Sequence, residues 1–403
     1  MLNLILFDTD ARHHLLPLTA TRPVGELRVG MLTLREKWER RLGGRSSYIT
    51  QEYLQERYPI AIEAENLILN AAVLPTTELC KLIEQVRLGE ALLDNGELIA
   101  ARLNEQQIEA LIEDEQLSEL HGIPLPEGFE LLTINRLWDI VRLNDRAMRD
   151  DFELLVQGRK SQPLSDTNRL IGPEDQLFIE EGVSLEACTI NTQTGPVYIA
   201  QNTVVMEGCL LRGPIYFGAD CIVKMGAKIY GPTAAGPGCR LGGELKNVVM
   251  IANSNKSHDG YLGDAVLGEW CNLGADTNNS NLKNNYSEVR LWDYTSERFE
   301  RSGMQFMGLV MGDHAKCGIN TMLNTGTVIG VFANVFGSGY QKNFIPDFAW
   351  GGPDTPHRTY KFSDACETAA LVMARRNVEF TEYDKAILYH VYDQTAKFRR
   401  WED

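Results

Sequence analysis

The chain has 403 residues, of which 44% are hydrophobic and 23% charged, so it has the composition of an ordinary globular protein with material for a large core. Lys and Arg number 39 against 55 Asp and Glu, and the formal net charge is −16. This balance argues against a general nucleic-acid-binding protein, which carries a basic face, but small anionic substrates need only local basic residues. The length favours two domains.

The first 160 residues alternate short apolar runs with helical patterns. Apolar runs at 2–7 and 66–75 predict strands, and the first is too short for a signal peptide. Helical patterns are present at 30–42, 76–93 and 134–156, the last with a break expected near Asn144. Strands that alternate with helices predict a Rossmann-like α/β sheet. The polar stretch 158–170 is expected to be a linker.

After the linker the chain repeats an apolar residue at every sixth position. Two blocks keep this spacing: Ile199, Val205, Leu211, Phe217, Val223 and Ile229, then Met311, Cys317, Leu323, Ile329 and Val335. A hexapeptide period predicts a parallel β-helix in which three hexads make one triangular coil. No run approaches the roughly 20 apolar residues of a membrane span.

Residues 230–310 break this rhythm, and a break in a solenoid is a typical place for function. It contains "NSNKSHDGYLGDA" (253–265), where His258 stands among small polar residues. The pattern from Asp364 onward is helical.

Eight cysteines are scattered along the chain without a CxxC pair, which argues against a zinc ribbon and a thioredoxin-like site. We expect reduced, buried thiols in a cytoplasmic protein.

The second half resembles, over about 100 residues, the bacterial GlmU-type family, which joins glucosamine-1-phosphate N-acetyltransferase and N-acetylglucosamine-1-phosphate uridyltransferase activities. In that family a Glu and a Lys precede the catalytic base by fourteen and twelve residues, as Glu244 and Lys246 precede His258. The family's Tyr-Leu-Gly-Asp follows as residues 261–264, and its two later asparagines match Asn272 and Asn281.

The resemblance implies that His258 is the general base, and neutral imidazole suits proton removal from a sugar ammonium. It implies that the sugar phosphate lies near Lys246 and Tyr261, and that acetyl-CoA lies in a groove between the subunits of a trimer. Two positions depart from the family, since its later Tyr is Leu282 and the Ser of its acetyl-CoA groove aligns with Ile319. Residues 292–306 look inserted.

The N-terminal half resembles the sugar nucleotidyltransferases more weakly. "ILFDTDARHHLLPLTATRPVGELR" keeps the family's strand, an Arg and a Pro-Leu-Thr, but Asp8-Thr9-Asp10 stands where the family has glycines. Without that loop the triphosphate must depend on side chains, and the candidates are Arg12, Thr19, Arg22 and Arg28. The family's Mg²⁺ ligands correspond to Asn144 and Asn70, although an amide is a poorer ligand than a carboxylate.

These observations predict a nucleotidyltransferase-like α/β domain (1–160), a left-handed β-helix with acyltransferase function (170–350) and a C-terminal helical extension (351–403). The leading hypothesis is a homotrimer that transfers acetyl from acetyl-CoA to glucosamine 1-phosphate and uridylyl from UTP to N-acetylglucosamine 1-phosphate, with Mg²⁺, towards UDP-N-acetylglucosamine. No nucleic acid or membrane partner is expected.

Two alternatives stay open. One is a nucleotidyltransferase whose β-helix only regulates or oligomerises. The other is an acyltransferase for a different sugar whose N-terminal domain only binds nucleotide. The Glu244, Lys246, His258 and Tyr261 constellation argues against the first, and the missing glycine loop keeps the second alive.

Overall fold

The computed structural model describes residues 2–112 and 120–401. It divides into two compact units. The first contains the chain up to Leu15, Arg22–Leu27 and Leu32–Arg136, and the second contains Leu16–Thr21, Arg28–Met31 and everything from Leu137 onward. The helix at 137–156 therefore belongs to the same unit as the β-helix. The domain ranges 1–160, 170–350 and 351–403 stay a prediction.

The first unit is built on a six-stranded sheet with the order β4-β1-β5-β7-β6-β8. The predicted strand at 2–7 is confirmed as β1, and its Leu4, Ile5 and Leu6 are fully buried, as expected for a strand in the parallel part of a sheet. The sheet strands are β1 (Leu2–Phe7), β4 (Gly44–Ile49), β5 (Asn66–Asn70), β6 (Glu90–Asp94), β7 (Glu97–Leu103) and β8 (His121–Pro124), and β3 (Leu32–Thr33) belongs to the same unit. The helices are α1 (Ala11–His14), η1 (Val24–Glu26), α2 (Leu34–Leu42), α3 (Glu52–Gln55), α4 (Thr77–Ile83) and α5 (Glu105–Ile112).

Two helical predictions in this unit need correction. The helix expected over 30–42 begins at Leu34, because Thr33 caps it by accepting a hydrogen bond from the backbone N–H of Glu36. The helix expected over 76–93 ends at Ile83, and residues 90–94 form strand β6. Gly89, at φ +82, adopts a left-handed conformation in the turn that leads directly into this strand.

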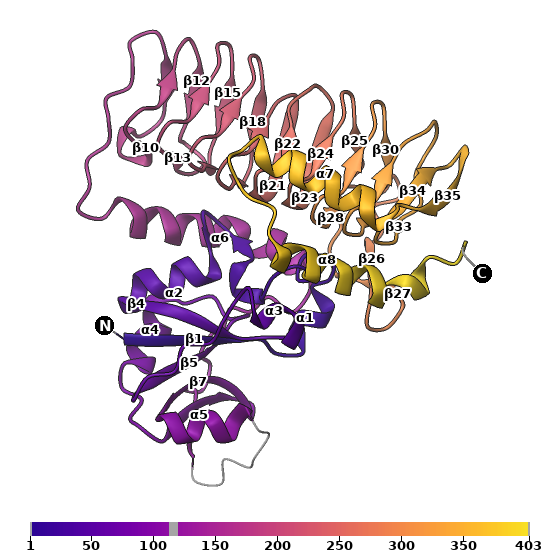
Figure 1. The fold of residues 1–403 in the computed structure, drawn as a ribbon. Helices are drawn as coiled ribbons and strands as arrows, with labels where there is room; N and C mark the ends of the chain where they lie inside the picture. Colours follow the sequence, from indigo (N-terminus) through magenta and orange to yellow (C-terminus); the bar gives the residue numbers. More distant parts are fainter. Residues whose placement is uncertain (1, 113–119, 402–403) are drawn as a thin grey trace. The chain divides into compact units, whose positions relative to one another are not determined.

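The second unit is a left-handed parallel β-helix whose coils are stacked side by side (Figure 1). Three ladders of strands form its faces. Ladder A contains β9 (Arg169–Ile171), β12 (Thr189–Asn191), β15 (Leu210–Arg212), β18 (Lys228–Tyr230) and the first residues of β21 (Glu244–Ala252) and β23 (Tyr261–Glu269). Ladder B contains β10 (Leu177–Ile179), β13 (Val197–Ile199), β16 (Ile215–Phe217), β19 (Thr233–Ala235), the later residues of β21 and β23, β28 (Val310–Met311), β31 (Val328–Ile329) and β33 (Phe344–Ile345).

Ladder C contains β11 (Ser184–Leu185), β14 (Val204–Val205), β17 (Ile222–Val223), β20 (Arg240–Leu241), β22 (Asn255–Lys256), β24 (Asn272–Leu273), β29 (Lys316–Cys317), β32 (Asn334–Val335), β34 (Ala349–Gly352) and β35 (Thr355–Thr359). Strands β25 (Asn278–Asn279) and β30 (Met322–Leu323) pair separately, and the short helix η2 (Glu174–Gln176) precedes β10. The hexad aliphatics and the cysteines point inward and form one buried core.

The break in the hexad rhythm does not interrupt the β-helix. Val223 pairs with Leu241, 18 positions later, whereas Leu241 pairs with Lys256 after only 15 positions. Shorter coils therefore hide the period while the stack continues. The genuine insertion lies between Asn281 and Met307 and contains the antiparallel hairpin β26 (Arg290–Asp293) and β27 (Arg298–Arg301), as expected for 292–306.

Helix α6 (Leu137–Val156) runs without the break expected at Asn144. Together with β2 (Arg28–Val29) it packs on the coils of its own unit. The C-terminal helical prediction is confirmed as α7 (Phe362–Ala374) and α8 (Glu382–Gln394), which share a buried cluster with Phe332 and Phe348 of the coils, and η3 (Ala396–Phe398) follows them. Within the described residues, none of the helices is both long and apolar enough to cross a bilayer.

Candidate functional site

The second unit brings four of the predicted acetyl-transfer residues onto one face. Glu244 and Lys246 begin β21, and their ladder partners on β23 are Tyr261 and Gly263. The intervening Leu245 and Leu262 are buried in the coil core, so the alternation of the strand turns the polar residues outward. Asn281 reaches the same place, because its amide donates a 3.0 Å hydrogen bond to the hydroxyl of Tyr261.

Asp264 organises this cluster. Its carboxylate lies 3.8 Å from the ammonium of Lys246 and accepts a 2.8 Å hydrogen bond from the amide of Asn247 and another from the amide of Asn281. Asp264 is buried, so its charge acts in an environment with little solvent screening. The result is a fixed anionic centre behind a half-exposed lysine.

The tyrosine of the Tyr-Leu-Gly-Asp motif explains the glycine of that motif. A Cβ on Gly263 would lie 2.3 Å from the Tyr261 hydroxyl oxygen, so the ring lies across the glycine. Burial, and then the nearby charge of Asp264, raise the pKa of Tyr261, which keeps its hydroxyl protonated. Next to it, the hydroxyl of Tyr230 donates a 2.7 Å hydrogen bond to Glu244, and burial raises the pKa of Tyr230 to about 12.

His258 lies in the bend that joins ladder C to ladder A, three residues before Tyr261, and its side chain is exposed. The bend is held from inside by Lys256, which occupies an inward position and is fully buried. The Lys256 ammonium donates hydrogen bonds to the backbone carbonyls of His258 and Asp259, the latter at 3.0 Å. Burial lowers the pKa of Lys256 to about 8.

Asn272 does not join this cluster. It belongs to ladder C, where its amide oxygen accepts a 3.3 Å hydrogen bond from Asn255, while Arg376 donates to the oxygen of Asn255 at 3.1 Å. The predicted acetyl-transfer residues are therefore divided between ladders A and C, with His258 at the corner between them.

In the first unit Arg12 is buried, and its guanidinium already has partners within the protein. It lies 3.5 Å from the carboxylate of Asp8, donates to the carbonyl of Arg22 at 3.1 Å and contacts the hydroxyl of Tyr53. Asp8 also accepts from the backbone N–H of Val24 at 2.8 Å, and burial raises its pKa despite the neighbouring guanidinium. The geometry gives Arg12 an internal partner in place of a phosphate.

The other predicted phosphate-binding residues are buried as well. Arg28 packs on the β-helix, where it donates to the carbonyl of Ile251 at 3.1 Å and lies 5.7 Å from the ring centroid of Tyr216. Thr19 belongs to the segment 16–21 of the second unit, and Arg22 to the first unit. The structure thus distributes these residues over separate environments.

The two asparagines proposed for Mg²⁺ do not fit a metal site. The amide oxygen of Asn144 accepts a 3.0 Å hydrogen bond from the backbone N–H of Gly30, and its nitrogen donates to the carbonyl of Pro232 and to Asn247 at 3.5 Å. The amide oxygen of Asn70 accepts from the N–H of Ala72 at 2.9 Å. Both are buried, and both use the oxygen that a metal would need. In the described part of the chain no group of three or more His, Cys, Asp or Glu side chains converges.

Sequence reasoning assigned no role to Asp264, Tyr230, Lys256 or Phe306, whose ring lies 4.7 Å from the Lys246 ammonium. The sequence could have predicted a role for Asp264, because this residue completes the Tyr-Leu-Gly-Asp match. The same holds for Lys256, because a lysine at an inward position of a β-helix needs an internal partner.

Comparison with known proteins agrees with this picture. Residues 4–160 match a family model described as sugar nucleotidyl transferase. The bifunctional sugar-1-phosphate nucleotidylyltransferase/acetyltransferase of Sulfurisphaera tokodaii is 33% identical over 93 residues, which is 23% of either chain. The bifunctional protein GlmU of Methanocaldococcus jannaschii is 32% identical over 87 residues, covering 22% of this chain and 21% of the relative.

A longer match reaches the bifunctional protein GlmU of Methanococcus vannielii, with 25% identity over 223 residues, 53% of this chain and 44% of the relative. The matched stretches thus span less than half the length of these relatives. The resemblance to GlmU-type proteins is confirmed at modest identity, and the matches indicate a transferase.

Proposed function

We propose that the chain is a bifunctional sugar-phosphate transferase that acetylates glucosamine 1-phosphate in its β-helix and transfers a uridylyl group from UTP to N-acetylglucosamine 1-phosphate in its N-terminal part. The observation that carries the first activity is the convergence of Glu244, Lys246, Tyr261 and Asn281 around Asp264. A structural coil has no need of a buried carboxylate that organises a lysine and two amides on its outer face.

In this proposal the phosphate of the sugar lies at Lys246 and the Tyr261 hydroxyl. Lys246 supplies positive charge, and the protonated hydroxyl supplies a hydrogen-bond donor. Glu244, held by Tyr230, orients the sugar hydroxyls. Asp264 keeps Lys246 in place, so the lysine does not have to be ordered when substrate arrives.

His258 accepts the proton that the sugar ammonium loses. The freed amine attacks the carbonyl carbon of the acetyl thioester, so that the C–N bond forms and the C–S bond breaks. Coenzyme A leaves as the thiolate and takes up the second proton, which the nitrogen releases as the amide forms. The exposed position of His258 suits a base that must meet a substrate brought to the corner of the coil.

A homotrimer is part of the proposal. Asn272 lies on ladder C while Glu244, Lys246 and Tyr261 lie on ladder A, so a neighbouring β-helix can bring an Asn272 to the site that one chain leaves incomplete. Light scattering at micromolar concentration is the test, and a stable monomer would contradict it. The eight free cysteines fit a reducing, cytoplasmic location.

Nucleotidyl transfer is supported by the family match over residues 4–160. The resemblance implies Mg²⁺ for this activity. Asn144 and Asn70 do not fit as its ligands, because their amide oxygens accept backbone hydrogen bonds. The second candidate is an acyltransferase for another sugar whose N-terminal part only binds nucleotide. It is favoured by the Arg12 guanidinium, which pairs with Asp8 and so is less available to a triphosphate.

Two parallel assays separate these functions. Release of coenzyme A thiol is measured with acetyl-CoA and glucosamine 1-phosphate, and release of pyrophosphate with UTP and N-acetylglucosamine 1-phosphate. Both products are expected. Thiol without pyrophosphate favours the second candidate, pyrophosphate without thiol favours a β-helix that only regulates or oligomerises, and neither product would contradict the proposal.

A further inference from the structure

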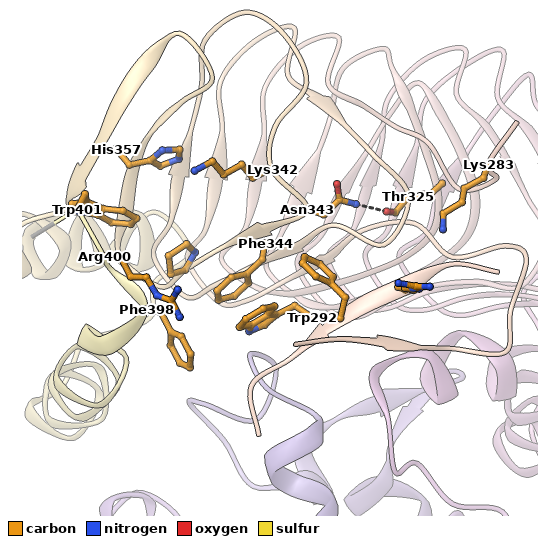
Figure 2. Close-up of a pocket in the computed structure, with 13 residues that line it drawn as sticks. Lys283, Trp292, Thr325, Lys342, Asn343, Phe344, His357, Phe398, Arg400 and Trp401 are labelled. Atoms are coloured by element: carbon orange, nitrogen blue, oxygen red, sulfur yellow. Dashed lines mark hydrogen bonds between the residues drawn. The ribbon is translucent and has the colours of Figure 1, made fainter. Parts of the chain in front are cut away.

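A cavity of about 670 Å³ lies in the second unit, outside the cluster around Asp264. Most of its walls come from three segments that are distant in sequence, namely the inserted hairpin β26–β27, residues 342–346 of the coils and residues 398–401, and Lys283, Thr325 and His357 complete the lining (Figure 2). This volume is within the usual range for a site that encloses a small molecule.

The cavity is lined by positive charge. Lys283, Arg290, Lys342 and Arg400 face it together with His357, and among the described residues that line it there is no Asp or Glu, although the chain as a whole carries −16. The four Lys and Arg side chains form no ion pair with a carboxylate in the described part of the chain, and Lys283 donates only to the backbone carbonyl of Glu288, at 2.7 Å. Burial, and then the charge of Lys342, lower the pKa of His357, consistent with a positive potential there. An anion with several negative charges is the ligand that this lining favours.

Flat aromatic surfaces make up much of the remaining wall. Trp292 stacks on Phe344 with ring centroids 4.3 Å apart and an angle of 13° between the planes. On another side of the cavity Trp401 stacks on His357 at 5.4 Å and 28° (Figure 2). Phe299, 41% exposed, meets Trp292 edge to face at 5.4 Å. Such faces bind planar heteroaromatic rings by stacking, and Arg stacks on the same rings as well.

The walls are anchored to the coils. The hydroxyl of Tyr294, next to β26, donates a 2.9 Å hydrogen bond to the buried carboxylate of Asp347. The C-terminal segment is tied by the 2.6 Å ion pair of Lys397 with Glu297 and by the 3.2 Å hydrogen bond of the Trp401 indole to Thr359. The hairpin and the C-terminal segment are thus held against the coils, and the stacked rings of the cavity wall are held with them.

We propose that this cavity binds a nucleoside phosphate, with its base against the aromatic wall and its phosphates among Arg290, Lys342 and Arg400. The shared chemistry is a planar base joined to at least two phosphate charges. Two sources carry it: a free nucleotide, and the adenosine phosphate part of coenzyme A. This binding does not depend on the acetyl-transfer or the nucleotidyl-transfer assignment, because all of its residues lie outside both sets.

The test is calorimetric titration of the full chain and of Lys342→Gln, Arg400→Gln and their double variant. Both side chains are exposed, so the variants are expected to fold. UDP, adenosine 3′,5′-bisphosphate, coenzyme A, pantetheine and inorganic pyrophosphate are the probes. At least one nucleoside phosphate is expected to bind, with about tenfold weaker affinity in each single variant and unchanged affinity in Lys361→Gln, which removes an exposed lysine elsewhere. Nucleotide affinities that are the same in the double variant and the wild type would overturn the proposal.

Phe299→Leu examines the aromatic wall separately. It is expected to lower the affinity for the nucleoside phosphate several-fold and to leave the affinity for pyrophosphate unchanged. If the protein binds pyrophosphate as tightly as the nucleotides, the proposed recognition of a base is overturned. Binding of adenosine 3′,5′-bisphosphate that competes with coenzyme A and is lost in the double variant, with pantetheine inactive, assigns the site to coenzyme A. Binding of UDP that is lost in the double variant assigns it to a free nucleotide.

Discussion

The buried ammonium of Lys256 donates a 3.0 Å hydrogen bond to the backbone carbonyl of Asp259 and holds the bend that carries His258. A charged side chain thus replaces the aliphatic residue that the interior of a coil normally contains. Its desolvation is offset by two backbone carbonyls at a turn, where ladder hydrogen bonds cannot reach them. The exposed histidine is positioned by a residue that the solvent does not reach.

Lys256 is expected to make the stability of the β-helix depend on pH. Its pKa is lowered to about 8 in the fold, below the ordinary lysine value, so the unfolded chain binds the proton more tightly. The cost of burying the charged Lys256 ammonium therefore destabilises the fold fully below about pH 8, and this destabilisation decreases as pH rises towards the pKa of the unfolded chain. Urea unfolding at pH 7.5 and 9.5 should therefore show wild type gaining stability relative to Lys256→Met. The stability difference between wild type and the exposed control Lys160→Met should be the same at both pH values. An equally constant difference for Lys256→Met would contradict this account.

His258→Ala should lower coenzyme A release by about 10² to 10⁴, the usual contribution of a general base, and leave pyrophosphate release and the oligomeric state unchanged. The comparison is His121→Ala, which removes an exposed histidine from the first unit. Activity of His258→Ala within threefold of wild type at pH 7.5 would mean that this side chain is only part of a surface bend.

Tyr261→Phe removes the hydroxyl that accepts from Asn281 but keeps the ring over Gly263. We expect an increase in the KM for glucosamine 1-phosphate of roughly tenfold, the equivalent of one hydrogen bond of about 1.5 kcal/mol to a charged group. The KM for acetyl-CoA should be unaffected, and so should both constants in Tyr286→Phe, where the tyrosine is exposed. Equal changes in both KM values would point to a general distortion of the coil.

Arg12→Ala is expected to destabilise the first unit by about 3–5 kcal/mol, because it leaves the buried Asp8 carboxylate without its cation. Arg45→Ala, which removes an exposed arginine from β4, should have little effect on thermal unfolding. The double variant Asp8→Asn with Arg12→Met should recover much of the loss. If Arg12→Ala unfolds like wild type and loses only pyrophosphate release, Arg12 binds the triphosphate after all.

Asn144→Asp tests whether Asn144 is a structural residue that joins Gly30 to the coils by hydrogen bonds or a metal ligand. A carboxylate cannot donate to the carbonyl of Pro232 or to Asn247, so a loss of about 1–3 kcal/mol is expected from buried groups left unsatisfied. Addition of Mg²⁺ should not restore the melting temperature. Restoration by millimolar Mg²⁺, absent in the exposed control Asn284→Asp, would support the metal role.

The hexad spacing was sufficient to predict the β-helix, because the inward aliphatics of a coil must recur with the period of its faces. It failed over 230–310 for a physical reason, since coils of 15 to 17 positions in place of 18 keep the ladder but move the apolar residues out of phase. The cluster around Asp264 was predictable from spacing along a motif, except for Asn272, which lies on ladder C. The phosphate-binding role of Arg12 and Arg28 stays a prediction, because proximity to the first strand gives no information on whether a guanidinium turns towards a ligand or towards Asp8 and Ile251.

The insertion between Asn281 and Met307 leaves the stack unbroken, for Leu273 pairs directly with Cys317, 44 positions later, and the Met307 N–H donates to the carbonyl of Asn281 at 2.9 Å. Entry and exit of the hairpin therefore meet at one corner, so the ladder hydrogen bonds of the stack continue past it. Such a corner is a natural grafting point, where an evolving lineage or a protein engineer can exchange one inserted segment for another without changing the register of the coils.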